Sequence, residues 1–509
     1  MWVGDVLDTD YLRQAGMRSV FKKDASSTAG KIRAASGVVA AAAAFLAGCT
    51  ILDPHVPAPD LDTPNLYINQ KGKTNTASPY DFVAFKSKYL TELIALGRGF
   101  NFDIGAAIAR IQEAEAQVRI ATQPLIPLIT TQGTGVSQSL IHQNGRAIRT
   151  TQVTAQLNGS YTLDIWGQYR SLLFAARASE WNASFAASLT TITTDASIAT
   201  TYFEAIGAQE QIVIAKRNLA AAQRILKAIR DRFAQGTASG LDVAQQETLV
   251  ANIAVTIPPL ERNLEQYKYA LAVLVGQAPE TFRYKGDKLF AVAVPVIPSG
   301  LPSDLLCRRP DIASAEAQLS AAKFDVSSAR AAMFPAITLT GTGGFQSTGL
   351  ANLFQPQNAF YNLAAGITQP LTNEYQLQAQ LDLQRATYGE LLQDYRKTIV
   401  SAFQNVESEL IAYKKDAEQE RLQHEAVISA RRAFQLSEEQ LRGGIIDVTT
   451  LLQVEQTLFT AEIAYAQIRQ TRLQDAVSLY QALGGGWYKP GDAGIAEVAS
   501  VIEVKAKTQ

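Results

Sequence analysis

Two stretches of this sequence are copies of one another. Residues 124–276 match residues 332–484 at a constant offset of 208 positions, and the match requires no gap. Pro127 falls on Pro335, Gly236 on Gly444 and Gly276 on Gly484. Self-similarity at a fixed spacing indicates a structural unit that occurs twice with the same elements in the same order. No Pro/Gly/Ser-rich linker divides the 509 residues, so we expect one continuous architecture rather than a series of domains.

Each copy opens with apolar side chains at every second position, which is the spacing of a β-strand. The residues at this spacing, most of them apolar, are Thr151, Val153, Ala155, Leu157, Tyr161, Leu163 and Ile165 in the first copy, and Ile337, Leu339, Gly341, Gly343, Phe345, Tyr361, Leu363, Ala365 and Ile367 in the second. We predict a β-hairpin at about 124–165 and another at about 334–371. A tilted strand that crosses the outer membrane needs roughly 9 to 11 residues, and these segments are long enough.

After each hairpin the apolar period changes to three and four residues, as in Tyr388, Leu391, Tyr395, Ile399, Phe403 and Val406. We predict long helices at about 168–234 and 376–440, because neither range contains proline; each would extend roughly 100 Å at 1.5 Å per residue. Glycine-containing turns at 236–240 and 443–444 end them. Return helices follow at about 241–276, interrupted by Pro258-Pro259, and at about 446–483.

Four membrane strands cannot close a barrel alone, because the smallest bacterial barrels use about eight strands and lipid tolerates no unpaired strand edge. A closed cyclic oligomer solves this problem, since each chain then donates four strands to one barrel and its helices to one coaxial tube. The expected product is a hollow conduit. The alternative is a periplasmic coiled-coil scaffold lipoprotein, which leaves the alternating hairpins unexplained.

The amino terminus reads as an export signal. Residues 31–49, KIRAASGVVAAAAAFLAGC, place two basic residues before an apolar run that is too short to span a bilayer. The run ends in Leu46-Ala47-Gly48-Cys49, which resembles the bacterial lipoprotein cleavage sequence, so residues 1–48 are predicted to be a signal peptide, with Met17 as another start. Cys49 would become the acylated first residue; the alternative is a small apolar residue in an Ala-rich helix. Thr50 follows Cys49 where, in the sorting pattern that this resembles, Asp would favour inner-membrane retention.

Composition and residue spacing argue against several other functions. Charged residues make up 18% of the chain and hydrophobic residues 47%, a balance that suits a protein partly facing lipid. The net charge is -1 and the sequence has no long basic run, so we expect no binding to nucleic acid. Two cysteines and three histidines show no disulfide framework and no metal-ligand spacing, so we expect no metal and no cofactor. No Gly-rich phosphate loop or Ser/His/Asp set stands out, so we expect no enzyme and no catalytic residue.

Several segments resemble the TolC-like outer-membrane factors, in the NodT-type lipoprotein branch that serves resistance-nodulation-division efflux pumps. The resemblance covers about residues 49–487 and rests on Leu305-Leu306-Cys307-Arg308-Arg309-Pro310-Asp311-Ile312, Phe334-Pro335, Leu163-Asp164-Ile165-Trp166-Gly167, Leu241-Asp242-Val243-Ala244-Gln245 and Ala482-Leu483-Gly484-Gly485-Gly486-Trp487.

The resemblance implies a mainly α-helical homotrimer with a twelve-stranded outer-membrane β-barrel, continuous with a twelve-helix periplasmic coiled-coil barrel. It divides the chain into repeats at 106–276 and 309–484 and an equatorial belt from 49–105, 277–308 and 485–509. It implies passive export of small molecules, supplied by an inner-membrane transporter through a periplasmic adaptor protein. A duct for type I protein secretion remains the rival function within transport.

In the family, acidic residues just after the tip turns line the closed periplasmic entrance, and Asp242 stands at that position. A ring of carboxylates at a narrow aperture would attract cations and repel itself. Asp242 is therefore the candidate gate residue, and its alternative role is to cap the return helix. The second copy has Thr450 at the matching position, with Asp447 nearby but out of register.

The tip surface for the adaptor is predicted at Gly236, Arg442, Gly443, Gly444 and Asp447. In the segment that links the two copies, Cys307 follows two leucines, and we expect it to be a buried structural thiol rather than a reactive one.

Overall fold

The structure is a computed structural model that describes residues 67–68, 82–141, 147–297 and 302–487. The chain divides into two units, Met1–Asp53 and Pro54–Gln509, and every described residue lies in the second. The predicted signal peptide at 1–48, the acylated Cys49 and most of the tail at 485–509 therefore lie outside the described residues.

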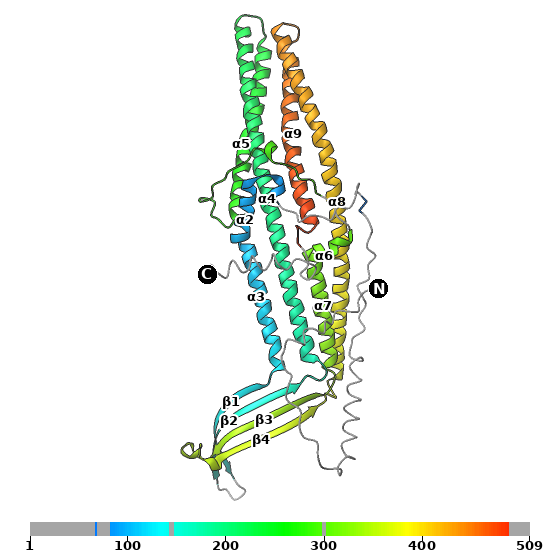
Figure 1. The fold of residues 1–509 in the computed structure, drawn as a ribbon. Coiled ribbons are helices and arrows are strands. Elements are labelled where there is room, and N and C mark those ends of the chain that lie inside the picture. The colour runs from blue at the N-terminus through cyan, green and yellow to red at the C-terminus, as the bar shows by residue number, and fades with distance from the viewer. Residues whose placement is uncertain (1–66, 69–81, 142–146, 298–301, 488–509) are drawn as a thin grey trace. The chain divides into compact units, whose positions relative to one another are not determined.

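The first copy consists of two short helices, a hairpin and a pair of long helices (Figure 1). Its elements are α2 (Lys88–Phe100), α3 (Phe102–Thr122), β1 (Leu128–Ile141), β2 (Ala147–Leu163), α4 (Gln168–Ala234) and α5 (Gly240–Leu274). The second copy repeats this order with α6 (Leu305–Arg308), α7 (Pro310–Ala331), β3 (Ala336–Ser347), β4 (Ala359–Thr368), α8 (Glu374–Arg442) and α9 (Val448–Ala482). The offset of 208 carries both ends of α5 onto those of α9, and the first residue of α3 onto that of α7, so the internal repeat extends back to residue 102.

The four strands form one antiparallel sheet in the order β1-β2-β3-β4. The central pairing joins the two copies, with Leu163 opposite Ile337 and Val153 opposite Ser347. Within the chain β1 and β4 are edge strands, so each has one side of backbone groups that this sheet leaves unpaired. On β4 the alternating residues Tyr361, Leu363 and Ile367 are 84%, 79% and 73% exposed, which is an unusual amount of open apolar surface for a strand.

The helices α4 and α8, of 67 and 69 residues, connect the sheet at one end to the helix–helix turns at the other (Figure 1). Helix α4 begins at Gln168 because the Asp164 carboxylate accepts the backbone N–H groups of Tyr169 and Arg170, at 3.1 and 2.9 Å. The strand-to-helix corner before it is packed: the Trp166 indole donates to the Pro335 carbonyl at 2.7 Å and stacks on Phe334. Among the described helices, none combines the length and the apolar character needed to cross a bilayer.

The main core lies midway along the helices, where α4 packs against α2, α5 and α9. Its centre is Tyr202 and Phe203 of α4, both fully buried, with Phe85 tilted against Phe203. The Tyr202 hydroxyl donates to the Asp287 carboxylate at 2.8 Å, and the Ser87 hydroxyl donates to the same oxygen at 2.6 Å. Residues from about 82–94 and 287–297 thus pack beside the middle of α4, within segments that the sequence assigns to the belt.

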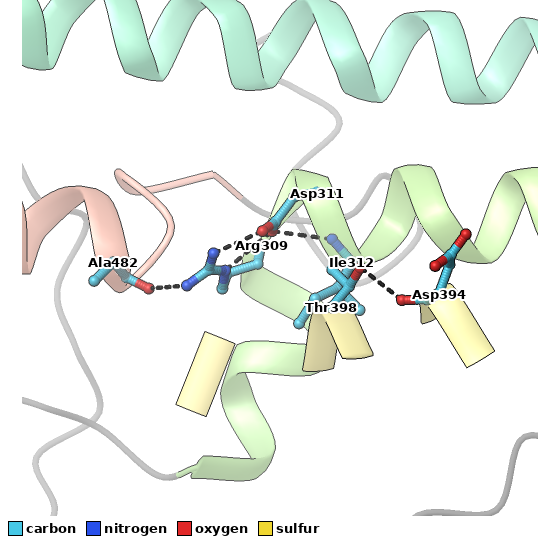
Figure 2. A network of polar contacts seen from close by, with 6 residues as sticks. All are labelled: Arg309, Asp311, Ile312, Asp394, Thr398 and Ala482. Atoms are coloured by element: carbon cyan, nitrogen blue, oxygen red, sulfur yellow. Dashed lines mark hydrogen bonds and ion pairs between the residues drawn. The ribbon is translucent and has the colours of Figure 1, made fainter. Parts of the chain in front are cut away.

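The repeat is also preserved in one side-chain contact within each copy. The Asn101 amide at the start of α3 donates to the carbonyl of Leu274, the last residue of α5, at 2.8 Å. At the equivalent place the Arg309 guanidinium donates to the carbonyl of Ala482, the last residue of α9, at 3.0 Å, and also binds the Asp311 carboxylate (Figure 2). Both copies therefore tie the start of one helix to the end of another through a single side chain.

The structure corrects two expectations. Pro258-Pro259 do not interrupt the return helix, because α5 continues from Gly240 to Leu274 through both prolines. The two missing N–H donors cost hydrogen bonds, but α5 packs along α4 and buries Ile253 and Ile257, so packing outweighs the loss. Cys307 is exposed rather than buried, because the one-turn helix α6 turns Leu305 inward instead.

Candidate functional site at the helical tips

The two helix–helix turns have the same backbone geometry. Gly236 and Gly444 adopt left-handed φ values of 71° and 70°, which glycine reaches without steric cost. In the first turn, the N–H groups of Gly236 and Thr237 return to the carbonyls of Phe233 and Arg232. The second turn repeats this pattern with Gly444 and Ile445. These bonds satisfy carbonyls that a helix end leaves open, and they reverse the chain within a few residues.

Asp242 lies in the first turn of α5 and is engaged in capping that helix. Its carboxylate accepts the Ser239 backbone N–H at 2.8 Å, while the Ser239 hydroxyl accepts the Asp242 backbone N–H at 3.2 Å. This reciprocal pair is a capping box, which satisfies two donors that the helix start leaves open. The structure therefore shows the capping role that the sequence offered as the alternative for Asp242, and the gate role remains a proposal.

Asp447 caps the second return helix from the preceding position. Its carboxylate accepts the Thr450 backbone N–H at 2.9 Å and the Thr450 hydroxyl. These bonds lower the pKa of the Asp447 carboxyl, first through the hydroxyl and then through the N–H. Ser239 and Asp447 are equivalent in the repeat, as are Asp242 and Thr450. The two copies thus use the same pair of capping positions. The acidic residue stands at the second position in the first copy (Asp242) and at the first position in the second copy (Asp447).

Arg442, Gly443, Gly444 and Ile445 form an exposed surface at the second tip. The Arg442 guanidinium lies 3.8 Å from the Glu438 carboxylate one turn earlier, and 77% of its side chain remains exposed. Sequence reasoning missed the exposed apolar residues of these tips, which are Phe233, Leu241 and Ile445 at 51%, 65% and 75%. Their signal was present, because Leu241 and Ile445 directly follow turn glycines and Phe233 lies three residues before Gly236, where polar residues would be ordinary.

The tips of the two copies contact each other within one chain. The Arg232 guanidinium of α4 donates to the Leu441 carbonyl of α8 at 2.9 Å. Beneath it, Ile225 and Ile229 of α4 form a buried cluster with Val448 and Leu451 of α9. The tip of the second copy is therefore packed against α4 of the first copy.

The residues predicted as a site are brought to one end of the helices, on two turns. Sequence reasoning missed the polar side chains that lie buried behind these turns, Gln246, Glu455 and Glu462. For Glu455 and Glu462 the signal was a glutamate at core spacing in the apolar pattern of α9. Within the ranges that the structure describes, no group of three or more His, Cys, Asp or Glu residues is placed to hold a metal ion.

Comparison with known proteins gives concordant matches. The model of a family described as outer membrane efflux protein matches residues 94–277 and 301–485, which are the two copies of the repeat. The pyoverdine export outer membrane protein OpmQ of Pseudomonas aeruginosa is 35% identical over 416 residues, covering 79% of this chain and 86% of that protein. The toluene efflux pump outer membrane protein TtgC of Pseudomonas putida is 33% identical over 409 residues, covering 80% and 84%.

Among solved structures, the CmeC outer membrane channel of Campylobacter jejuni matches with a TM-score of 0.82 at 22% identity. The match covers 90% of this chain and 98% of that channel. At this level of identity the likeness concerns the fold.

Proposed function

Because this chain belongs to the outer membrane efflux protein family, we propose that it is the exit duct of a tripartite efflux pump. The family places the protein in the outer membrane with a periplasmic helical part, and it describes efflux channels rather than enzymes. In the proposed role the duct is passive. An inner-membrane resistance-nodulation-division transporter supplies the energy, and a periplasmic adaptor protein connects the two.

The observation that carries the proposal is the open sheet at one end of the long helices. Among the described residues, both edges of the four-stranded sheet are unpaired, and β4 exposes Tyr361, Leu363 and Ile367. Lipid accepts such a surface only when the edges are closed by other strands. A homotrimer would join β4 of one chain to β1 of the next and close a twelve-stranded barrel, while α4, α5, α8 and α9 of three chains would form a twelve-helix tunnel.

The tips are the proposed entrance and the docking surface for the adaptor. Arg442, Gly443 and Gly444 are exposed at the second turn, and Gly236 and Asp447 stand at equivalent or neighbouring turn positions. Asp242 is proposed as the residue that narrows the entrance, as one carboxylate from each of three chains. Its capping bonds support this role, because they hold the carboxylate at a fixed place near the turn.

The lipid anchor at Cys49 and the belt formed by 49–105, 277–308 and 485–509 are part of the same proposal. Acylation would hold the chain at the inner face of the outer membrane before and after assembly. The names of the relatives include pyoverdine and toluene, so the cargo proposed here is small molecules of varied chemistry rather than one compound. A type I protein-secretion duct and a coiled-coil scaffold are the functions against which the test is set.

The test is planar-bilayer conductance of the purified full-length protein, with its mass in detergent measured alongside. A trimeric mass with discrete, mostly closed conductance steps is expected. A water-soluble species that forms no pores would overturn the duct and favour the scaffold. Deletion of the gene separates the two kinds of cargo: sensitivity to small toxic compounds is expected, whereas loss of a secreted protein alone would favour type I secretion.

A further inference from the structure

Helix α9 carries two glutamates on a stripe that is otherwise apolar. In the half of α9 nearer the tip, the buried positions are Val448, Leu451, Glu455, Leu458 and Glu462, spaced by three and four residues as at a coiled-coil seam. Glu455 and Glu462 are 4% and 5% exposed and lie seven residues apart. A buried carboxylate is costly unless a positive charge or several hydrogen bonds compensate it, so the partners of the two glutamates can be compared directly.

Glu462 is fully compensated. Arg217 of α4 binds one carboxylate oxygen at 2.5 Å, Asn218 binds the same oxygen at 3.1 Å, and Arg431 of α8 binds the other at 2.7 Å. Burial alone would raise the pKa of the Glu462 carboxyl, but the bonds from Arg431 and Asn218 and the charge of Arg217 outweigh it and lower the pKa. Glu462 is therefore ionised, and its ion pairs connect α9 to α4 and α8.

Glu455 lacks that compensation. Its described hydrogen bond comes from the Gln246 amide of α5, at a long 3.5 Å, and its other oxygen is buried with no partner. The Gln246 amide also donates to the Ala222 carbonyl of α4 at 3.0 Å, while its own oxygen is unpartnered. In the part of the chain that the structure describes, no arginine or lysine forms an ion pair with Glu455.

Where Glu462 has Arg431 of α8 as its partner, Glu455 has the acidic residue Glu438 of the same helix. Helices α8 and α9 are antiparallel, so one heptad from the Arg431–Glu462 pair brings Glu438 toward Glu455. The repeat leads to the same pair independently, because the positions equivalent to Glu438 and Glu455 in the first copy are Arg230 and Glu247. Those two form an ion pair at 2.6 Å. The second copy thus has two carboxyls where the first has a salt bridge.

The surroundings offer little else that is charged. Arg442 reaches Glu438 from one turn away at 3.8 Å. Helix α4 contributes the Ala222 carbonyl and Ile225 here, with Arg224 exposed, and α5 contributes the amides of Gln245 and Gln246. Burial raises the pKa of the Glu455 carboxyl to about 7; the Gln246 bond lowers it, and the negative charge of Glu438 raises it further.

We propose that Glu455 is a proton-binding site that holds the tips of the second copy closed, and that its ionisation beside Glu438 drives α9 away from α5 and α8. This inference rests on the proposed function, in which the tips are the entrance of the duct. The first copy keeps its ion pair, so the tips of α4 and α5 would stay closed while the tips of α8 and α9 move apart.

The direction of the pH dependence follows from the two states. In the closed state the Glu455 carboxyl keeps its proton up to about pH 7, whereas a solvated glutamate in the open state ionises near pH 4.3, roughly. The closed state binds more protons between these values, so the contribution of the Glu455 proton to closure is full below the lower value and is lost as the pH rises toward the upper value. The ratio of open to closed tips is expected to rise by up to about tenfold per pH unit in each subunit, and to level off above pH 7, roughly.

The experiment measures two quantities on the full-length protein between pH 5 and pH 8. The first is open probability in planar bilayers. The second is the distance between spin labels introduced by Thr248→Cys and Gln456→Cys, in a Cys307→Ser background, across the cleft of about 460 Å³ that these residues line between α5 and α9. Both are expected to increase with pH in the parent protein, and to remain at their acid values in Glu455→Gln, whose amide is neutral throughout.

A charge swap keeps the test decisive if the amide variant proves unstable. Glu438→Arg recreates the pair found in the first copy and is expected to keep the tips closed up to pH 8. Glu247→Gln, at the equivalent position of the first copy, is the matched control. It breaks the ion pair with Arg230, so the open probability is expected to rise by the same factor at every pH, while the change of both quantities with pH should match the parent's. A pH profile in Glu455→Gln that equals the parent's would overturn the proposal. A pH-dependent distance without pores would overturn the duct but not the proton site, and pores with a constant distance would do the reverse.

Discussion

At the scale of single residues, two equivalent glycines each allow a close approach of backbones within their own copy of the repeat. Gly276 and Gly484 have φ values of 70° and 92°, and an added Cβ would meet the backbone carbonyls of Phe100 and Arg308. Those carbonyl residues are themselves equivalent in the repeat, so one close approach of backbones occurs twice. A side chain at either position would be strained by its φ and blocked by backbone that cannot move aside.

Gly276→Ala and Gly484→Ala are therefore each expected to lower the free energy of unfolding by about 3 kcal/mol or more. Gly389 of α8 is the control, because a Cβ there meets nothing within 4 Å, and Gly389→Ala should be neutral or slightly stabilising. Thermal unfolding of the three variants in detergent measures the difference. Equal melting temperatures for all three would contradict the close approach.

The two roles of Asp242 can be separated by choosing the substitution. Asp242→Asn removes the charge but keeps an oxygen that can accept the Ser239 N–H, whereas Ser239→Ala removes the other half of the cap and leaves the charge. If Asp242 lines the entrance, Asp242→Asn is expected to increase single-channel conductance and reduce cation preference. Ser239→Ala should change neither and cost about 1 kcal/mol of stability. The gate role fails if Asp242→Asn conducts as the parent does.

At the scale of elements, one buried carboxylate connects three helices, and its removal should show in stability. Glu462 binds Arg217 of α4 and Arg431 of α8 from α9. Because the two arginine side chains are 55% and 51% exposed, they can rehydrate when the carboxylate is removed. Glu462→Ala is expected to cost about 1–3 kcal/mol, measured by thermal unfolding. Lys415→Ala, which breaks an exposed i,i+3 pair with Glu418, should cost far less.

Much of the element order could be read from the sequence, because periodicity and proline placement act locally. The first long helix was predicted at about 168–234 and lies at Gln168–Ala234; the second return helix was predicted at about 446–483 and lies at Val448–Ala482. The interruption at Pro258-Pro259 was wrong, because packing along α4 decides that helix and a local rule does not see it. The division of the chain into repeats and belt segments stays a prediction.

The candidate site was less readable. The turn glycines were predicted because a left-handed turn leaves a sequence signal, and both have the positive φ that such a turn needs. The partners of Glu455 and Glu462 could not be predicted, since they come from α4, α5 and α8, up to about 245 residues away in the chain. The caps also could not be predicted in full. Their hydrogen bonds show that Ser239 and Asp447 are both N-cap residues, one with a hydroxyl and the other with a carboxylate.

At the scale of the whole molecule, membrane attachment is expected to depend on Cys49, which lies outside the described residues. Cys49→Ser should abolish incorporation of labelled palmitate and leave an uncleaved precursor larger than the parent protein, because lipoprotein processing requires the thiol. Electrophoresis of membrane fractions after labelling measures both. Ser at the exposed Cys307 is the control and should leave labelling unchanged. Palmitate in the Cys49→Ser protein would place the anchor elsewhere.

The equal length of the two return helices has a consequence for how this protein can change in size. Helices α5 and α9 are each 35 residues long, which is five heptads. One added residue would rotate every later side chain by about 100°, and so turn the seam away from its neighbours. A longer or shorter version of this molecule must therefore gain or lose whole heptads in α4, α5, α8 and α9 together, so that its reach varies in steps of roughly 10 Å.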